Sequence, residues 1–142
     1  MKQGKRGWFL TTVAMLFVLL AISNFLKPVL ASAQTGFVFF GRRLSGLPND
    51  ILGPVFGFIL VALAILIWRM RRPAVTLAWA YTAYVVANTV LYAIVNPPGA
   101  AGADGMKSQY ARPVLAIVFL IVGLGVPLAT AVVLTRRRAE LA

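Results

Sequence analysis

The sequence predicts an all-α, polytopic membrane protein: a four-helix transmembrane bundle of two hairpins in one membrane domain, residues 1–142. Four long apolar runs carry this prediction, at residues 8–26, 51–68, 75–95 and 114–135. A helix rises about 1.5 Å per residue, so about twenty residues cross the roughly 30 Å hydrocarbon layer of a bilayer. The composition agrees, since 61% of the residues are hydrophobic and 12% charged, whereas soluble domains carry about 25% charged residues.

Basic residues lie at alternate ends of the four runs, and this arrangement predicts the orientation. One cluster precedes the first run, one separates the second from the third, and one follows the fourth: Lys2/Lys5/Arg6, Arg69/Arg71/Arg72 and Arg136/Arg137/Arg138. Loops rich in Lys and Arg stay in the cytoplasm. We therefore expect a multi-pass protein of the cell membrane with both termini cytoplasmic, and the 27–50 and 96–113 loops outside.

The composition also excludes several kinds of chemistry. The chain has no Cys and no His, which removes disulfides, thiol redox chemistry, histidine bases and the usual zinc ligands. Its three acids do not form a pair within a span, and general acid–base catalysis needs titratable groups within reach of the substrate. We therefore expect no enzyme, no cofactor and no bound metal. The net charge is +11, but the basic residues lie at the ends of the apolar runs and do not follow one face. We therefore expect no nucleic-acid partner.

The first run begins at Trp8 and Phe9, which suit the headgroup level of a membrane. It should end near Lys27-Pro28, because the residue before a proline is disfavoured in helical geometry. Its basic start and the small residues 31–33 also resemble a signal peptide with its cleavage site. The run exceeds the roughly 7–15 apolar residues of a signal peptide, which favours an uncleaved helix. Cleavage, leaving three spans, is the alternative.

The connection from residue 28 to residue 50 is the longest in the chain and holds the apolar stretch 37–40 before Arg42 and Arg43. Two interpretations stay open. The stretch lies in the membrane interface, with Arg42 and Arg43 in contact with lipid headgroups, or it forms a loop packed over the mouth of the bundle.

The second run opens at Asn49-Asp50, residues that favour a helix N-cap. Gly53 and Gly57 follow at a spacing of four, which lets two helices approach closely in lipid. The rest of the run is apolar. We therefore expect Gly53 and Gly57 to mark a helix-packing surface.

The third run contains the most polar set within the membrane region: Tyr81, Tyr84, Asn88 and Tyr92. At about 100° per residue these four lie within an arc of about 80° on one helix face. They either hydrogen-bond neighbouring helices, since a buried amide in lipid must find a partner, or line a small cavity for a lipid-like or aromatic ligand. They are the candidate ligand-binding residues.

The fourth run contains Gly123, Gly125 and Pro127 near its middle. A proline inside a helix removes one backbone hydrogen bond and usually kinks the helix. The sequence therefore predicts a kink between residues 123 and 127.

Two functions follow from these features. The first is a non-enzymatic, small integral membrane protein that acts as a structural or accessory subunit, packing against itself or a larger membrane complex. It rests on the glycine spacing of the second run and the absence of reactive groups. The alternative is a small carrier or binder of a hydrophobic or lipid-like small molecule, which would use the Tyr/Asn face of the third run.

Overall fold

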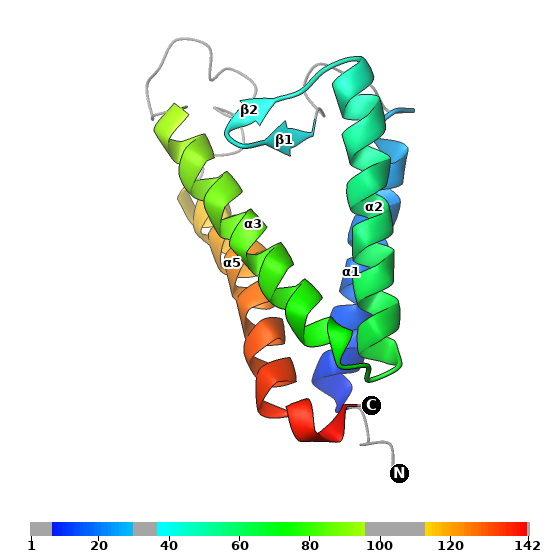
Figure 1. The fold of residues 1–142 in the computed structure, drawn as a ribbon. Coiled ribbons are helices and arrows are strands. Elements are labelled where there is room, and N and C mark those ends of the chain that lie inside the picture. Colours follow the sequence, from blue (N-terminus) through cyan, green and yellow to red (C-terminus); the bar gives the residue numbers. More distant parts are fainter. Residues whose placement is uncertain (1–6, 30–36, 96–112, 142) are drawn as a thin grey trace.

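The computed structural model describes residues 7–29, 37–95 and 113–141, apart from the side chains of residues 113–120. It is mainly helical, as the sequence predicts (Figure 1). The long helices are α1 (Trp8–Leu26), α2 (Leu47–Trp68), α3 (Pro73–Val95) and α5 (Pro113–Arg136), and the 3₁₀ helix η1 (Arg138–Glu140) follows α5. Two short strands, β1 (Val38–Phe39) and β2 (Arg42–Arg43), lie between α1 and α2. Helices α1, α2 and α3 are each long and apolar enough to cross a membrane.

The start of α2 differs from the sequence expectation. The helix begins at Leu47, with Gly46 as its N-cap, so Asn49 and Asp50 lie inside its first turn. Pro48 explains the earlier start, because a proline fits the first helical turn, where its missing N–H has no intrahelical partner. The Asn49 side chain does not cap the helix, and its oxygen accepts a hydrogen bond from Phe37 N–H instead.

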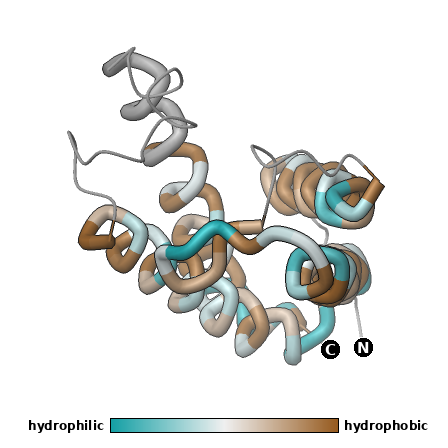
Figure 2. The backbone as a smooth tube through the Cα atoms, turned by 90° about the horizontal axis from the view of Figure 1, so that it is seen from above, coloured by the Kyte–Doolittle hydropathy of each residue, from teal (hydrophilic) through white to brown (hydrophobic). Residues whose placement is uncertain are grey.

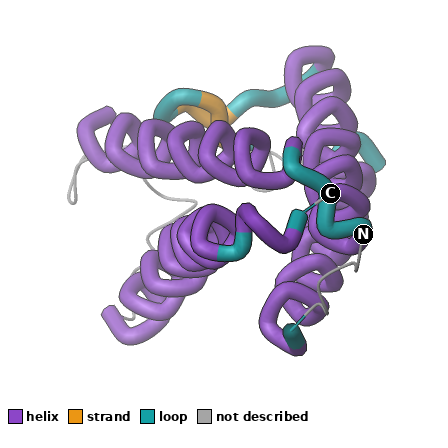
Figure 3. The backbone as a smooth tube through the Cα atoms, turned by 60° about the horizontal axis from the view of Figure 1, so that its bottom comes forward, coloured by secondary structure: helices purple, strands orange, loops and turns teal. Residues whose placement is uncertain are grey.

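The helices pack as two pairs, α1 with α2 and α3 with α5. Figure 1 shows the pairs close together where the α2–α3 turn lies and diverging toward the β1–β2 hairpin. Figure 3, seen from the closed end, shows the start of α1 and the end of η1 beside this turn. The predicted two hairpins are therefore present, but they form a V and not a bundle closed along its whole length.

The hydrophobic core fills the closed end of the V. Small residues on α3 and α5, Ala74, Ala78 and Ala131, are almost fully buried and let the helices approach closely. The larger core side chains come mainly from α1 and α2: Leu10, Val13, Phe17, Leu60, Leu63 and Ile67, with Leu134 from α5. Phe17 also meets Tyr81 of α3 edge to face, with 5.7 Å between ring centroids.

Large apolar side chains are exposed on the helices, and Figure 2 shows hydrophobic stretches along each of the long helices that it colours. Leu19, Phe58 and Ile94, on three different helices, are 61%, 67% and 67% exposed. Exposure of large apolar side chains on every side of a molecule is expected where lipid is the surrounding solvent. The surface therefore agrees with insertion of the helices in a membrane.

The described basic clusters gather at the closed end. Arg72, in the α2–α3 turn, donates from Nε to the carbonyl oxygen of Leu141 at 3.4 Å. Arg137 packs beside Gly7 at the start of α1, 3.4 Å from the position of an added Cβ there. The α2–α3 turn, the C-terminal segment and the start of α1 thus lie together, while Lys2, Lys5 and Arg6 fall outside the described residues.

Candidate functional site

The candidate site lies at the open end of the V, where a β-hairpin joins the two helix pairs. Strands β1 and β2 are antiparallel, with Val38 opposite Arg43 and Phe39 opposite Arg42. The two turn residues, Phe40 and Gly41, have φ angles of 44° and 81°. A two-residue hairpin turn of this hand needs positive φ at both positions, because its twist then matches that of the strands.

The hairpin is anchored to α1 and α2 through Phe37, the buried residue before β1. Phe37 N–H donates to Asn49 Oδ1 at 2.8 Å. The Phe37 ring lies 4.9 Å from the ring of Phe56 on α2. The ammonium of Lys27, just beyond the end of α1, lies 4.4 Å above the centre of the Phe37 ring. Both helices of the first pair therefore hold one end of the hairpin.

The other end of the hairpin is anchored to α3. The Tyr84 hydroxyl and the Asn88 amide Nδ2 both donate to the carbonyl oxygen of Val38, each at 3.3 Å. At the hairpin turn, a Cβ added to Gly41 would stand 2.7 Å from the backbone oxygen of Leu91. The turn therefore rests directly on the α3 backbone.

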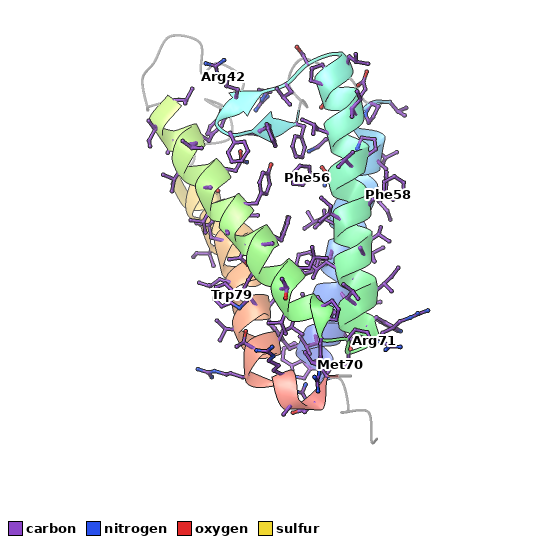
Figure 4. The ribbon with its side chains drawn as sticks, viewed as in Figure 1. Arg42, Phe56, Phe58, Met70, Arg71 and Trp79 are labelled. Atoms are coloured by element: carbon purple, nitrogen blue, oxygen red, sulfur yellow. The ribbon has the colours of Figure 1, made fainter. Side chains whose placement is uncertain are left out.

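Aromatic rings fill the space under this contact and touch both helix pairs. The Tyr84 ring lies 4.6 Å from Phe56, so α2 and α3 meet here through these two side chains. Rings of the hairpin surround this pair, with Phe39 at 6.3 Å and Phe40 at 5.9 Å from Tyr84. Figure 4 shows the Phe56 ring pointing from α2 toward α3. Each such aromatic pair stabilises the fold by about 0.5–1.5 kcal/mol beyond the effect of burial. The ring cluster therefore helps to hold the two helix pairs together at the open end.

The structure divides the predicted polar face of α3 among three different contacts. Tyr84 and Asn88 bind the hairpin, and Tyr81 packs against Phe17 of α1. The backbone of Tyr92 lies beside the hairpin turn, with its N 3.2 Å from an added Gly41 Cβ. Asn88 Oδ1 is buried and has no hydrogen-bond partner among the described residues.

The other predicted positions lie as follows. Gly53 and Gly57 are buried where α2 meets α1: added Cβ atoms would stand 2.9 Å from the Asn24 backbone oxygen and 3.0 Å from the Phe25 ring. Helix α5 is continuous through Pro127, which is buried, and added Cβ atoms at Gly123 and Gly125 would meet nothing within 4 Å.

On the hairpin, Arg42 is exposed and Arg43 half-buried. Their contact with lipid headgroups stays a prediction.

The sequence does not predict several residues of this site, among them Lys27, Asn49 and Phe56. Each makes a contact with Phe37, which lies in a different segment of the chain. The apolar stretch 37–40 is the feature of the sequence that points to these contacts. An apolar segment outside a membrane span is expected to pack against other residues or against lipid.

The described contacts of the site are hydrogen bonds and ring contacts between the hairpin and the helices. No group of three or more His, Cys, Asp or Glu that could hold a metal ion occurs among the described residues. Comparisons with protein-family models, with curated proteins and with solved structures found no match. The arrangement joins two helix pairs through hydrogen bonds and stacked rings, and this bracing is what its geometry supports.

Proposed function

We propose that the protein is a non-enzymatic, multi-pass protein of the cell membrane that acts as a structural or accessory subunit and associates through helix packing. The outward face of α3 carries this proposal. It presents small residues in one row: Thr76, Ala80 and Ala83, all exposed, and the half-buried Ala87. At about 100° per residue, these four lie within an arc of about 60°.

This row points away from the rest of the protein. The buried α3 residues Ala74, Ala78 and Thr82 lie on the opposite side of the helix. Contact with lipid does not require small side chains, because large apolar side chains suit lipid equally well. Small residues, in contrast, let a second helix approach closely. The row therefore suits a helix of another copy or of a larger membrane complex.

The engagement of the α3 polar face supports the same function. Tyr84 and Asn88 hydrogen-bond within the chain, so they serve first to position α3 against the hairpin. A carrier of a hydrophobic small molecule is the second candidate, and it rests on Asn88 Oδ1, a buried acceptor that has no hydrogen-bond partner among the described residues. Replacing Asn88 with leucine separates the two, because it abolishes binding by a carrier and leaves association through the outward face of α3 intact.

Association through α3 can be tested with a photo-crosslinking amino acid at position 83 in cell membranes. A discrete protein adduct is expected from position 83, since Ala83 is exposed in the centre of the row. The matched position is Ala62, an exposed alanine on α2, which should yield mostly lipid adducts. Equal protein adducts from both positions, or none from position 83, would contradict the proposal.

The orientation that we propose has both termini in the cytoplasm. It is supported by the grouping of the basic α2–α3 turn with the C-terminal segment, because basic segments remain on the cytoplasmic side. The hairpin end would then face outward.

This orientation predicts which single cysteines react in intact cells, and the chain offers a clean background because it contains no cysteine. A cysteine at Ser45, exposed beside the hairpin, should react with a membrane-impermeant maleimide. A cysteine at Ala139, exposed at the closed end, should react only after the membrane is opened. The reverse pattern would invert the proposed orientation.

A further inference from the structure

Lys27 occupies an unusual place for a lysine at the end of an apolar helix. Its stem crosses the face of α2, with Cβ and Cδ 3.5 and 3.8 Å from an added Cβ at Gly53. Its ammonium then lies over the ring of Phe37, 4.4 Å from the centre. The side chain therefore crosses from α1 over α2 to the hairpin.

The charge of this ammonium is not balanced by the part of the protein that the structure describes. No described carboxylate lies within 4 Å of the Lys27 nitrogen, and the ring of Phe37 is its described partner. Burial lowers the pKa of Lys27 from its usual value. Lys27 is half-buried, and a cation partly withdrawn from water is stabilised by an anion or hydrogen-bond acceptor beside it.

The described residues of the open end carry more basic than acidic side chains. The described charged residues of the open end are three bases, Lys27, Arg42 and Arg43, against one acid, Asp50. Asp50 is exposed and accepts a hydrogen bond from the Asn49 side chain at 3.4 Å. An anion at this end would thus meet an excess of positive charge.

The position of Lys27 indicates which anion is available. Helix α1 has 19 residues, or about 28 Å at 1.5 Å per residue, so its two ends reach the two boundaries of the hydrocarbon layer. Lys27 follows the last residue of this helix, so in the proposed membrane location it lies at the depth of the lipid headgroups. Exposed apolar side chains flank it, Leu26 at 44% and Val29 at 80% exposure, and these suit acyl chains.

We infer that Lys27 binds the phosphate of an anionic phospholipid at the open end of the V. The ammonium donates hydrogen bonds to the phosphate oxygens, and the Phe37 ring supports its other side. Basic residues near a membrane surface each contribute measurably to the binding of anionic lipid. This site rests on the membrane location proposed above and is independent of association through α3.

Native mass spectrometry of the full-length protein in detergent tests the site, with phosphatidylglycerol and phosphatidylcholine of the same acyl chains as probes. Lys27→Gln should weaken phosphatidylglycerol binding about fivefold, and Lys27→Arg should retain it. Arg71→Gln is the matched control, since it removes one exposed charge at the closed end. Equal effects of Lys27→Gln and Arg71→Gln, or no effect of Lys27→Gln, would overturn the site.

A second measurement needs no substitution and so holds even where Lys27→Gln misfolds. Phosphatidylglycerol should protect Lys27 of the unaltered protein from acetylation by acetic anhydride, read at the modified peptide, and phosphatidylcholine should protect it less. Lys2 and Lys5 serve as internal references. Inorganic phosphate at the same concentration should give little protection. Equal protection by inorganic phosphate, or none by phosphatidylglycerol, overturns the lipid site while leaving the crosslinking result at position 83 unaffected.

Discussion

Replacing Gly53 with alanine should lower the free energy of unfolding by about 1–3 kcal/mol, the usual cost of adding a methyl group to a tightly packed contact. The new Cβ would stand 2.9 Å from the backbone oxygen of Asn24. A backbone oxygen within a helix cannot rotate aside, so α1 as a whole must shift away from α2. Unfolding of the purified protein in detergent micelles, followed by circular dichroism, measures the loss.

Two other helical glycines provide a graded control. At Gly57 the added Cβ would meet the Phe25 ring at 3.0 Å, and a ring can turn, so Gly57→Ala should cost less than Gly53→Ala. At Gly123 nothing lies within 4 Å. Gly123→Ala should therefore leave stability unchanged or raise it, since alanine favours a helix over glycine by about 0.8–1.0 kcal/mol. Equal losses at Gly53 and Gly123 would show that α1 and α2 are not closely packed.

The positions of the long helices could be predicted because length and hydropathy determine them. The first run was expected at residues 8–26, and α1 has these bounds, since Trp8 marks one boundary and Lys27-Pro28 the other. Helix α2 begins at Leu47, earlier than predicted, because the prediction rests on the cap-forming side chains of Asn49 and Asp50. Pro48 is compatible with the first turn of a helix. The Asn49 side chain does not cap this helix, because its oxygen accepts a hydrogen bond from Phe37 N–H.

The hairpin could not be predicted from the same signals. Each strand has two residues, too few for an alternating pattern. Its turn also violates the usual preference, because a bulky residue, Phe40, takes a φ of 44°, where glycine or asparagine is favoured. Contacts with α3, 46 and 50 residues away in sequence, evidently compensate for this local strain.

The spacing of residues in the sequence predicts the polar face of α3 but not the partners of that face. Helical periodicity places Tyr84 and Asn88 on one face, and both donate to the same oxygen of Val38. The identity of that acceptor depends on a hairpin that periodicity does not reveal. The small residues Ala80 and Ala83 also follow helical spacing, but the spacing does not tell which way they face. Their exposure in the structure shows that they face outward.

The second large loss of stability is expected at Gly41, in the turn of the hairpin. Replacing Gly41 with alanine should cost about 2–4 kcal/mol, from two separate causes. A φ of 81° is unfavourable for any residue with a Cβ, and that Cβ would stand 2.7 Å from the Leu91 backbone oxygen on α3. Hydrogen exchange followed by mass spectrometry measures the result, as lost protection of Leu44 N–H, which bonds to the Phe37 oxygen at 2.8 Å.

Gly46 is a second glycine with positive φ, and it lies away from α3. Its backbone, with a φ of 64° and a ψ of −146°, lies in a region that residues with a Cβ rarely adopt, and an added Cβ there would meet nothing within 4 Å. Gly46→Ala should therefore strain the start of α2 without pressing on α3. Gly41→Ala should lower the protection of α3 amides beside the hairpin turn, such as Tyr92 N–H, whereas Gly46→Ala should leave them protected. If Gly41→Ala leaves these α3 amides as protected as Gly46→Ala does, the hairpin does not brace the open end, and the two helix pairs are joined only by the core at the closed end.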